Sequence, residues 1–129
     1  MQQTENHKLN LIEPGDPFSP EALNENTQAI DAALTRFTCG TYTGNGASSR
    51  MVELPFTPKL VYVGNGVGCI FYYTGYYFYV GGLALPGLPA MAFSFPLVTI
   101  VEGGFQVGHS SDTLSSNNKG SGYRYFAFG

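Results

Sequence analysis

Residues 60–101 contain no Asp, Glu, Lys or Arg at any of 42 consecutive positions. An exposed surface normally carries charge, so this stretch must be covered by a membrane or by protein. A membrane span is excluded, because glycines and prolines leave no apolar helix of about 18 residues. These residues are Gly75, Gly81, Gly82, Pro86, Gly87 and Pro89. We therefore expect a body whose charge-poor surface is hidden between like subunits.

The composition describes one domain with few ionised groups. The chain has 129 residues, of which 12% are charged and 15% are aromatic, and its formal net charge is -3. This acidic balance argues against nucleic acid as a partner, because binding phosphates needs a basic face. No run of Lys or Arg indicates an anionic membrane surface. We expect neither nucleic-acid binding nor membrane insertion.

The first residues and the cysteines indicate assembly in a cytosol. Residues 1–8 are polar and lack the apolar core of a secretion signal. Cys39 and Cys69 are then expected to be reduced, buried small hydrophobes, with a disulfide between them as the alternative. His7 and His109 have no ligand-like spacing, and two cysteines alone make no zinc site. We expect no metal and no cofactor.

The N-terminal part of the chain is polar and charged. Residues 1–37 hold eight charged side chains, six of them acidic. Residues 1–18 are expected to form an extended arm with a turn at Pro14-Gly15-Asp16-Pro17. Three apolar side chains of this arm are expected to dock on a neighbouring protein: Leu9, Leu11 and Ile12.

An amphipathic helix is predicted over residues 19–38. Ser19 is a suitable N-cap, and Pro20 is tolerated at the first helical position. The carboxylate of Glu21 favours the positive end of the helix dipole. Gly40 is a suitable terminator.

One face of this helix has the spacing of a coiled-coil seam. Its residues are separated by 4, 3, 4 and 3 positions over about two heptads: Leu23, Thr27, Ile30, Leu34 and Phe37. One interpretation is that the helix lies on its own domain. We favour an oligomerisation seam, because isolated helices of this length are marginally stable.

Residues 39–129 are predicted to form an antiparallel β-sandwich head. Tyr123, Tyr125 and Ala127 alternate with three residues that face the other way, and Asn45-Gly46 and Asn65-Gly66 are turn dipeptides. Short strands separated by turns at this spacing are typical of a sandwich or barrel. The expected strands are 40–45, 50–56, 59–64, 68–73, 76–82, 92–101, 104–109 and 121–128.

Several segments carry a family resemblance. In the N-terminal part they are Leu9–Asp16, Leu23–Asn26 and Ala29–Asp31, and in the body Gly40–Gly46, Leu54–Val63, Gly103–Val107 and Gly122–Gly129. The first set resembles the leader of tail proteins from phages of Gram-positive bacteria. The second resembles the C-terminal heads of phage tail fibres. The Phe56–Val61 stretch is also similar to H-type lectin domains, which are trimeric sugar-binding sandwiches.

These resemblances imply a homotrimeric virion component at a tail tip or baseplate, with no catalytic residues. Tail fibres often carry a long shaft between leader and head, whereas here the leader joins the head directly. The chain is therefore expected to be a compact tip or an accessory cap.

Enzymatic signals in the sequence are weak. Gly108–Asp112 superficially resembles a nucleophile motif but lacks the closing glycine and a strand–helix elbow. Glu53, Glu102 and Asp112 are scattered and show no spacing of a glycosidase pair. The glycines occur in strand turns rather than before a helix, so no phosphate loop is indicated. We expect no catalytic residue.

Tyrosines are concentrated in one short segment. A tyrosine ring stacks on sugar rings and its hydroxyl bonds to theirs, so this cluster suits carbohydrate binding. The alternative, which we favour for most of these residues, is that they fill the core or line a subunit interface. They are Tyr72, Tyr73, Tyr76, Tyr77 and Tyr79.

Loop positions provide a second indication of a binding site. If successive strands run antiparallel, the turns near 57, 74 and 102 lie at the end where the chain enters the head. The loops 45–49, 64–68, 83–91 and 110–120 then lie at the far end, where long loops often carry recognition. The apolar loop 83–91 suits packing at a three-fold axis or on a protein, and the polar loop 110–120 suits a carbohydrate. The alternative is that both loops are plain solvated or packing loops without a binding role.

The expected function follows from these features. We expect a homotrimeric phage tail fibre or tail-tip protein, assembled in the bacterial cytoplasm and carried on the virion tail. Its arm would contact tail or baseplate proteins, and its head would bind a host glycan or wall polymer. The alternatives are a structural cap or connector without a receptor site, and an H-type-like lectin. The candidate receptor-binding residues are Asn45, Asn65, Ser110, Ser111, Asp112, Asn117, Asn118 and Lys119.

Overall fold

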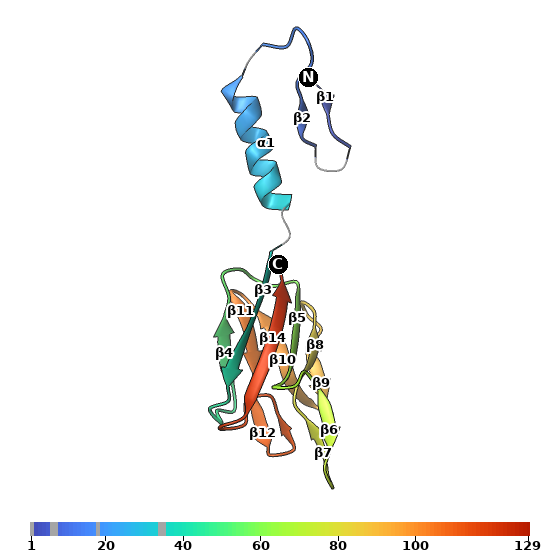
Figure 1. Cartoon of the computed structure of the whole chain (residues 1–129), viewed down its shortest axis with the longest axis vertical. Helices are drawn as coiled ribbons and strands as arrows, with labels where there is room; N and C mark the ends of the chain where they lie inside the picture. The colour runs from blue at the N-terminus through green and yellow to red at the C-terminus, as the bar shows by residue number, and fades with distance from the viewer. Residues whose placement is uncertain (1, 6–7, 18, 34–35) are drawn as a thin grey trace. The chain divides into compact units, whose positions relative to one another are not determined.

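The computed structural model describes residues 2–5, 8–17, 19–33 and 36–129, and the chain divides into two compact units, Met1–Thr35 and Arg36–Gly129. Within the described residues the chain is mainly β, with one short N-terminal helix and several antiparallel sheets (Figure 1). This part of the predicted fold class is confirmed.

The first unit contains a small β pair and the helix. β1 (Gln2–Gln3) pairs antiparallel with β2 (Asn10–Leu11), so the segment predicted as an extended arm folds back on itself. The helix α1 spans Pro20–Ala33. Its first turn is capped as predicted, because Ala22 N donates a hydrogen bond to Ser19 Oγ at 3.3 Å.

Two asparagines attach the arm to α1. Asn26 Nδ2 donates to the Asn10 carbonyl oxygen at 3.0 Å, and Asn26 Oδ1 accepts from Asn10 N. Asn10 Nδ2 in turn donates to the Ala22 carbonyl oxygen at 3.1 Å and to Glu25 Oε2 at 2.8 Å. Asn26 thus satisfies both main-chain groups of Asn10, as a neighbouring strand would. The arm therefore covers the face of α1 that holds Ala22 and Asn26.

The helix is shorter than the predicted 19–38 span. α1 ends at Ala33, and β3 (Phe37–Thr43) follows. Gly40 lies inside β3, opposite Tyr125, and does not terminate the helix. A Cβ at Gly40 would meet the Tyr125 hydroxyl at 2.6 Å. The glycine is therefore needed because a tyrosine ring crosses it.

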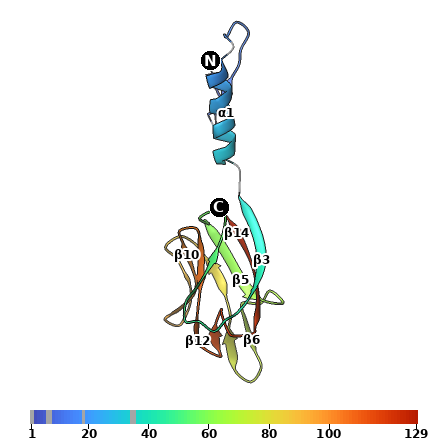
Figure 2. The ribbon, with the colours of Figure 1, turned by 90° about the vertical axis from the view of Figure 1, so that its left-hand side faces the viewer.

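The second unit, which we call the head, contains two four-stranded antiparallel sheets. The first sheet has the order β3-β14-β5-β8, in which β14 is Gly122–Phe128, β5 is Leu60–Asn65 and β8 is Gly82–Ala84. The second sheet has the order β4-β11-β10-β9, with bounds Arg50–Glu53, Gly104–Val107, Phe95–Val101 and Ala90–Ala92. The two sheets face each other (Figure 2).

A third sheet consists of four very short strands in the order β12-β13-β7-β6. Their bounds are His109–Ser111, Leu114–Ser115, Tyr77–Tyr79 and Phe71–Tyr73. β12–β13 and β6–β7 are antiparallel hairpins, and the parallel pair Leu114 and Tyr79 joins them. Three predicted strands each run over two observed ones: 76–82 holds β7 and part of β8, 92–101 holds the end of β9 and all of β10, and 104–109 holds β11 and the first residue of β12.

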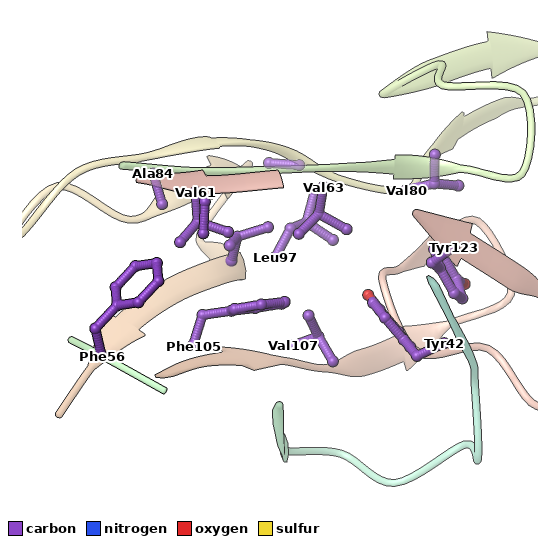
Figure 3. Close-up of a cluster of buried hydrophobic side chains, with 13 residues drawn as sticks. Tyr42, Phe56, Val61, Val63, Val80, Ala84, Leu97, Phe105, Val107 and Tyr123 are labelled. Carbon is purple, nitrogen blue, oxygen red and sulfur yellow. The ribbon is translucent and has the colours of Figure 1, made fainter. Parts of the chain in front are cut away.

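The core lies between the first and second sheets. Figure 3 shows Val61 and Val63 on one side and Phe105 and Val107 on the other, with Leu97 among them. All five side chains are buried. The predicted alternation of β14 is confirmed, because its inward residues belong to this core or pack against it. They are Tyr123, Tyr125 and Ala127.

The break between β7 and β8 contains a glycine that close packing requires. A Cβ on Gly81 would collide with the carbonyl oxygen of Val63, so only glycine lets the chain cross β5 this closely. The break between β9 and β10 contains Phe93, which has a φ of 57°. This conformation is unusual for a bulky residue and turns the chain sharply into β10.

The loops at the two ends of the head differ from the predicted arrangement. Arg36 and Gly129 mark one end, where Gly129 N donates to the Arg36 carbonyl oxygen at 2.8 Å. We call the opposite end the distal end. The β6–β7 turn lies at the distal end, although position 74 was predicted at the other (Figure 1). The loop 83–91 was predicted at the far end and instead turns at the entry end, because β8 runs directly back along β5.

Candidate functional site

The third sheet unites two features that the sequence analysis treated separately. The polar hairpin β12–β13 and the tyrosine-rich hairpin β6–β7 meet where Tyr79 N donates to the Thr113 carbonyl oxygen at 2.9 Å. β13 and β7 are parallel at Leu114 and Tyr79, so the tips of both hairpins project in the same direction. The distal end therefore presents an aromatic and a polar surface side by side.

One face of the β6–β7 hairpin continues into a row of aromatic rings. We call this row the aromatic strip; it consists of Phe71, Tyr73, Tyr77, Tyr79 and Phe93. The ring centroids are 4.9 Å apart for Tyr73 and Tyr77, 6.1 Å for Phe71 and Tyr77, and 5.4 Å for Tyr79 and Phe93. Phe93 is 82% exposed and Tyr73 62% exposed, whereas Tyr79 packs against the core. The strip is therefore an exposed surface that packs against the core through Tyr79.

The remaining tyrosines of the cluster lie elsewhere on the hairpin. Tyr72 stacks on Phe78, with centroids 4.8 Å apart and planes 3° from parallel. Tyr76 lies in the turn and is 72% exposed. The core-filling interpretation thus describes Tyr79, whereas Tyr73, Tyr76 and Tyr77 are exposed in the single chain.

A hollow adjoins the aromatic strip. It has a volume of about 430 Å³, and Phe71 and Tyr79 belong to both its wall and the strip. The rest of its lining comes mainly from β8, β9 and the residues between them, including Leu83 and Met91. Apolar side chains and glycine backbone line most of it, so the strip and the hollow form one continuous uncharged surface.

Four of the predicted receptor-binding residues are exposed in or next to the polar hairpin. Ser111 Oγ lies 3.4 Å from Thr113 Oγ1, which leaves its other hydrogen-bonding capacity open to solvent. The four exposed residues are Ser110, Ser111, Asp112 and Lys119.

Asn117 is not available to a receptor, which corrects its predicted role. Its side chain is 0% exposed. Its Nδ2 donates to Asn45 Oδ1 at 2.6 Å and to the Ala47 carbonyl oxygen at 3.1 Å, and its Oδ1 accepts from Asn45 N at 3.1 Å. Asn117 therefore holds loop 45–49 against the end of the polar hairpin. Asn45 is exposed as a residue, but its Oδ1 is used in this contact.

Two other predicted asparagines also have structural contacts. Asn65 Oδ1 accepts hydrogen bonds from Val67 N at 3.1 Å and Cys69 N at 2.9 Å, which closes the turn after β5. Asn118 contributes its main-chain N–H to the Tyr123 hydroxyl at 2.9 Å. Asn65 therefore shapes the distal end through its side chain, whereas Asn118 contributes only its main chain to the contact with Tyr123.

The distal end rests on a buried tyrosine pair that the sequence analysis did not identify as structural. Tyr42 and Tyr123 stack with centroids 5.1 Å apart, and the Tyr42 hydroxyl donates to the Ser116 carbonyl oxygen at 2.7 Å. The Arg50 guanidinium lies 5.3 Å from the centre of the Tyr42 ring. Burial raises the pKa of Tyr42 far above its ordinary value, and nearby Tyr123 adds to the rise while Arg50 opposes it.

We expect Tyr42 to make the stability of the head depend on alkaline pH. Its raised pKa in the folded state means that its contribution is complete below the unfolded pKa of about 10 and is lost as pH rises above that value. Between pH 9 and 11, the free energy of unfolding of the Tyr42→Phe variant should fall by about 1 kcal/mol less than that of wild type. Urea unfolding at both pH values measures it, and an unchanged loss in the variant would assign the pH dependence to other groups.

The outer face of the first sheet is apolar. Phe37 is 56% exposed, and its ring lies 5.1 Å from Phe128. A hollow of about 390 Å³ lies on this face, lined in part by Tyr62 and Phe126. Arg124 also lines it and is exposed. Phe37 was predicted in the helix seam and belongs to this sheet face instead, because β3 has already begun.

Both cysteines are exposed, which corrects the prediction that they are buried. Cys39 and Cys69 are free thiols. Cys39 lies opposite Phe126 and points away from the core because its neighbours in β3 alternate inward. Cys69 lies in the turn after β5.

The predicted helix seam is exposed where it is described. Leu23 is 40% exposed and Ile30 is 48% exposed. Thr27 lies between them and donates its hydroxyl to the Leu23 carbonyl oxygen at 3.0 Å. Leu34 lies outside the described residues. The exposed part of the seam lies beside the face that the arm covers and leaves its apolar side chains available to another surface.

The imidazole of His109 contacts a buried serine, with Nδ1 2.9 Å from Ser115 Oγ. Among the described residues no three His, Cys, Asp or Glu side chains come together as metal ligands. In the same ranges, no helix has the length and apolar character needed to cross a bilayer. Comparison of the chain with protein-family models, with curated proteins and with solved structures gives no match.

Proposed function

We propose that this chain is a phage tail fibre or tail-tip protein that trimerises and attaches to the host cell surface through a glycan or wall polymer. The observation that carries the proposal is the third sheet, which brings the aromatic strip and the polar hairpin to the distal end. Sugar recognition needs a flat apolar surface for stacking and polar groups for the hydroxyls. Both are exposed there on a rigid head.

Self-association is supported by two apolar surfaces. The outer face of the first sheet carries Phe37, Phe126 and Phe128, and α1 presents Leu23 and Ile30. Burying such surfaces between copies removes apolar area from water, at about 25 cal/mol per Å². In this proposal the head is a β-sandwich in a homotrimer, and several weak glycan sites act together through high effective concentration.

Virion attachment is assigned to the arm. Leu11 is 43% exposed and Ile12 is 60% exposed, and the hydrogen bonds of Asn10 hold this segment on α1. A preformed apolar segment loses less conformational entropy on docking than a free chain. We propose that tail or baseplate proteins cover these residues.

The oligomeric state tests the assembly directly. Light scattering of the full chain should give about three times the 13.9 kDa of one copy. Leu23→Glu combined with Ile30→Glu should reduce this mass to that of one copy, because two charges would be buried in the seam. Gln28→Glu, an exposed change on the same helix, should leave the mass unchanged. A monomeric wild-type chain would contradict the homotrimer.

Attachment is tested on phage particles that carry the chain. Gold-labelled antibody against the head should mark the tail tip, and the same antibody should block adsorption to host cells. Labelling without a block would support the cap or connector alternative. Particles that contain the chain nowhere in the tail would contradict the proposal.

A further inference from the structure

The aromatic strip lies in a region without charge of its own. Every strip residue falls within residues 60–101, which contain no Asp, Glu, Lys or Arg. All residues that line the hollow also lie between Ile70 and Leu97, so none of them is charged. A ligand on this surface meets rings, methyl groups and main-chain amides.

The cations of the head that lie nearest the distal end are not part of the strip or of the hollow. Arg50 Nη1 donates to the Thr43 carbonyl oxygen at 2.6 Å. The Arg124 guanidinium lies beside Gly68, whereas Lys119 is exposed and only its Cβ and main-chain N lie beside Gly46. None of the three lines the hollow, and the hairpin that shares the third sheet with the strip adds the acidic Asp112. A polyanion gains affinity by being neutralised by basic groups, and the strip and the hollow offer none.

The geometry of the strip suits a flat neutral ring. Tyr73 and Tyr77 are exposed with ring centroids 4.9 Å apart, and Phe71 extends the row at 6.1 Å from Tyr77. A pyranose with equatorial hydroxyls has an apolar C–H face that lies against such rings while its hydroxyls reach water or the tyrosine hydroxyls. The row has room for consecutive sugar units because it continues to Tyr79 and Phe93.

We infer that the distal site binds an uncharged pyranose oligosaccharide, and not a phosphate-rich wall polymer such as poly(glycerol phosphate). The inference rests on the proposed attachment function and specifies its ligand class. Stacking on Tyr73 and Tyr77 supplies the contact, and the polar hairpin supplies hydrogen bonds at the edge. Binding of this kind depends little on salt, whereas phosphate binding weakens steeply with it.

The test uses the full chain with two kinds of fluorescent probe. The first kind is neutral hexasaccharides of β-linked glucose and of β-linked N-acetylglucosamine, and the second is poly(glycerol phosphate). We expect binding to a neutral probe, with less than a twofold change in Kd between 50 and 500 mM NaCl. Tyr77→Ala should raise Kd at least tenfold, and Tyr77→Phe should change it less than threefold because the ring is kept. Tyr76→Ala is the matched control, since Tyr76 lies in the turn of the same hairpin and outside the strip, and should change Kd less than twofold.

Four results would overturn the inference. They are binding of the phosphate polymer with steep salt dependence, no binding of either neutral probe, partition of the chain into phosphatidylcholine vesicles without sugar binding, and loss of the oligomer in Tyr77→Ala. The last would identify the strip as an interface between copies. If antibody still blocks adsorption in any of these cases, the attachment function stands and only its ligand class is wrong.

Discussion

Replacement of Phe105 with alanine is expected to lower the free energy of unfolding by about 3–5 kcal/mol. Phe105 is 0% exposed, and its ring meets the edge of Tyr125 with centroids 5.1 Å apart. β11 lies between β4 and β10 in the second sheet, so strands on both sides hold the site open. Alanine would leave a cavity that these strands cannot close, and both lost burial and the cavity contribute to the cost.

Urea unfolding at neutral pH measures this effect, and Gln106→Ala provides the control. Gln106 is the next residue of β11 and is exposed, so its substitution should change the free energy of unfolding by no more than about 0.5 kcal/mol. Phe105→Leu should retain most of the burial and lie between the two. A loss below about 1 kcal/mol in Phe105→Ala would contradict a core centred on this ring.

Local patterns in the sequence predict those elements whose structure depends on neighbouring residues alone. Ser19 caps α1 because its hydroxyl is next to the free N–H groups of the first turn. β14 alternates between core and outer face, so the positions of Tyr123 and Ala127 follow from strand geometry alone. A short helix followed in the chain by a mainly β head was predictable because caps and strand alternation are both local patterns.

The third sheet was not predictable, because its central pairing has no local signal. β13 is two residues long, and one parallel pair, Leu114 and Tyr79, joins it to β7. The prediction assumed that 68–73 and 76–82 are successive members of the main sheets. They instead form a separate hairpin, which places its turn at the distal end and sends loop 83–91 to the entry end.

The aromatic strip was missed as a unit for a related reason. Tyrosine spacing in the sequence shows which hairpin residues share a face, but Phe93 joins them only through tertiary packing on Tyr79. Its φ of 57° turns the chain there, and nothing in its neighbours indicates that conformation. The binding surface thus combines a local pattern with a contact between segments that the sequence does not pair.

Substitution of Asn117 by alanine is expected to destabilise the head by about 2–4 kcal/mol. The side chain is fully buried, and its three closest partners are Asn45 Oδ1 at 2.6 Å, Asn45 N at 3.1 Å and the Ala47 carbonyl oxygen at 3.1 Å. Alanine removes donor and acceptor together. The groups of loop 45–49 that it held would then lose their hydrogen bonds, which costs more than the bonds contribute when intact.

Asn118→Ala is a matched control, because the same side chain is truncated one position along. In the part of the chain that the structure describes, hydrogen bonds reach Asn118 through its main chain, with its N–H on the Tyr123 hydroxyl at 2.9 Å. We expect its free energy of unfolding to lie within about 0.5 kcal/mol of wild type. Equal stability of the two variants in urea would show that Asn117 does not support the distal end. If Asn117→Ala weakens glycan binding only in proportion to its unfolded fraction, Asn117 supports the site without contacting the ligand.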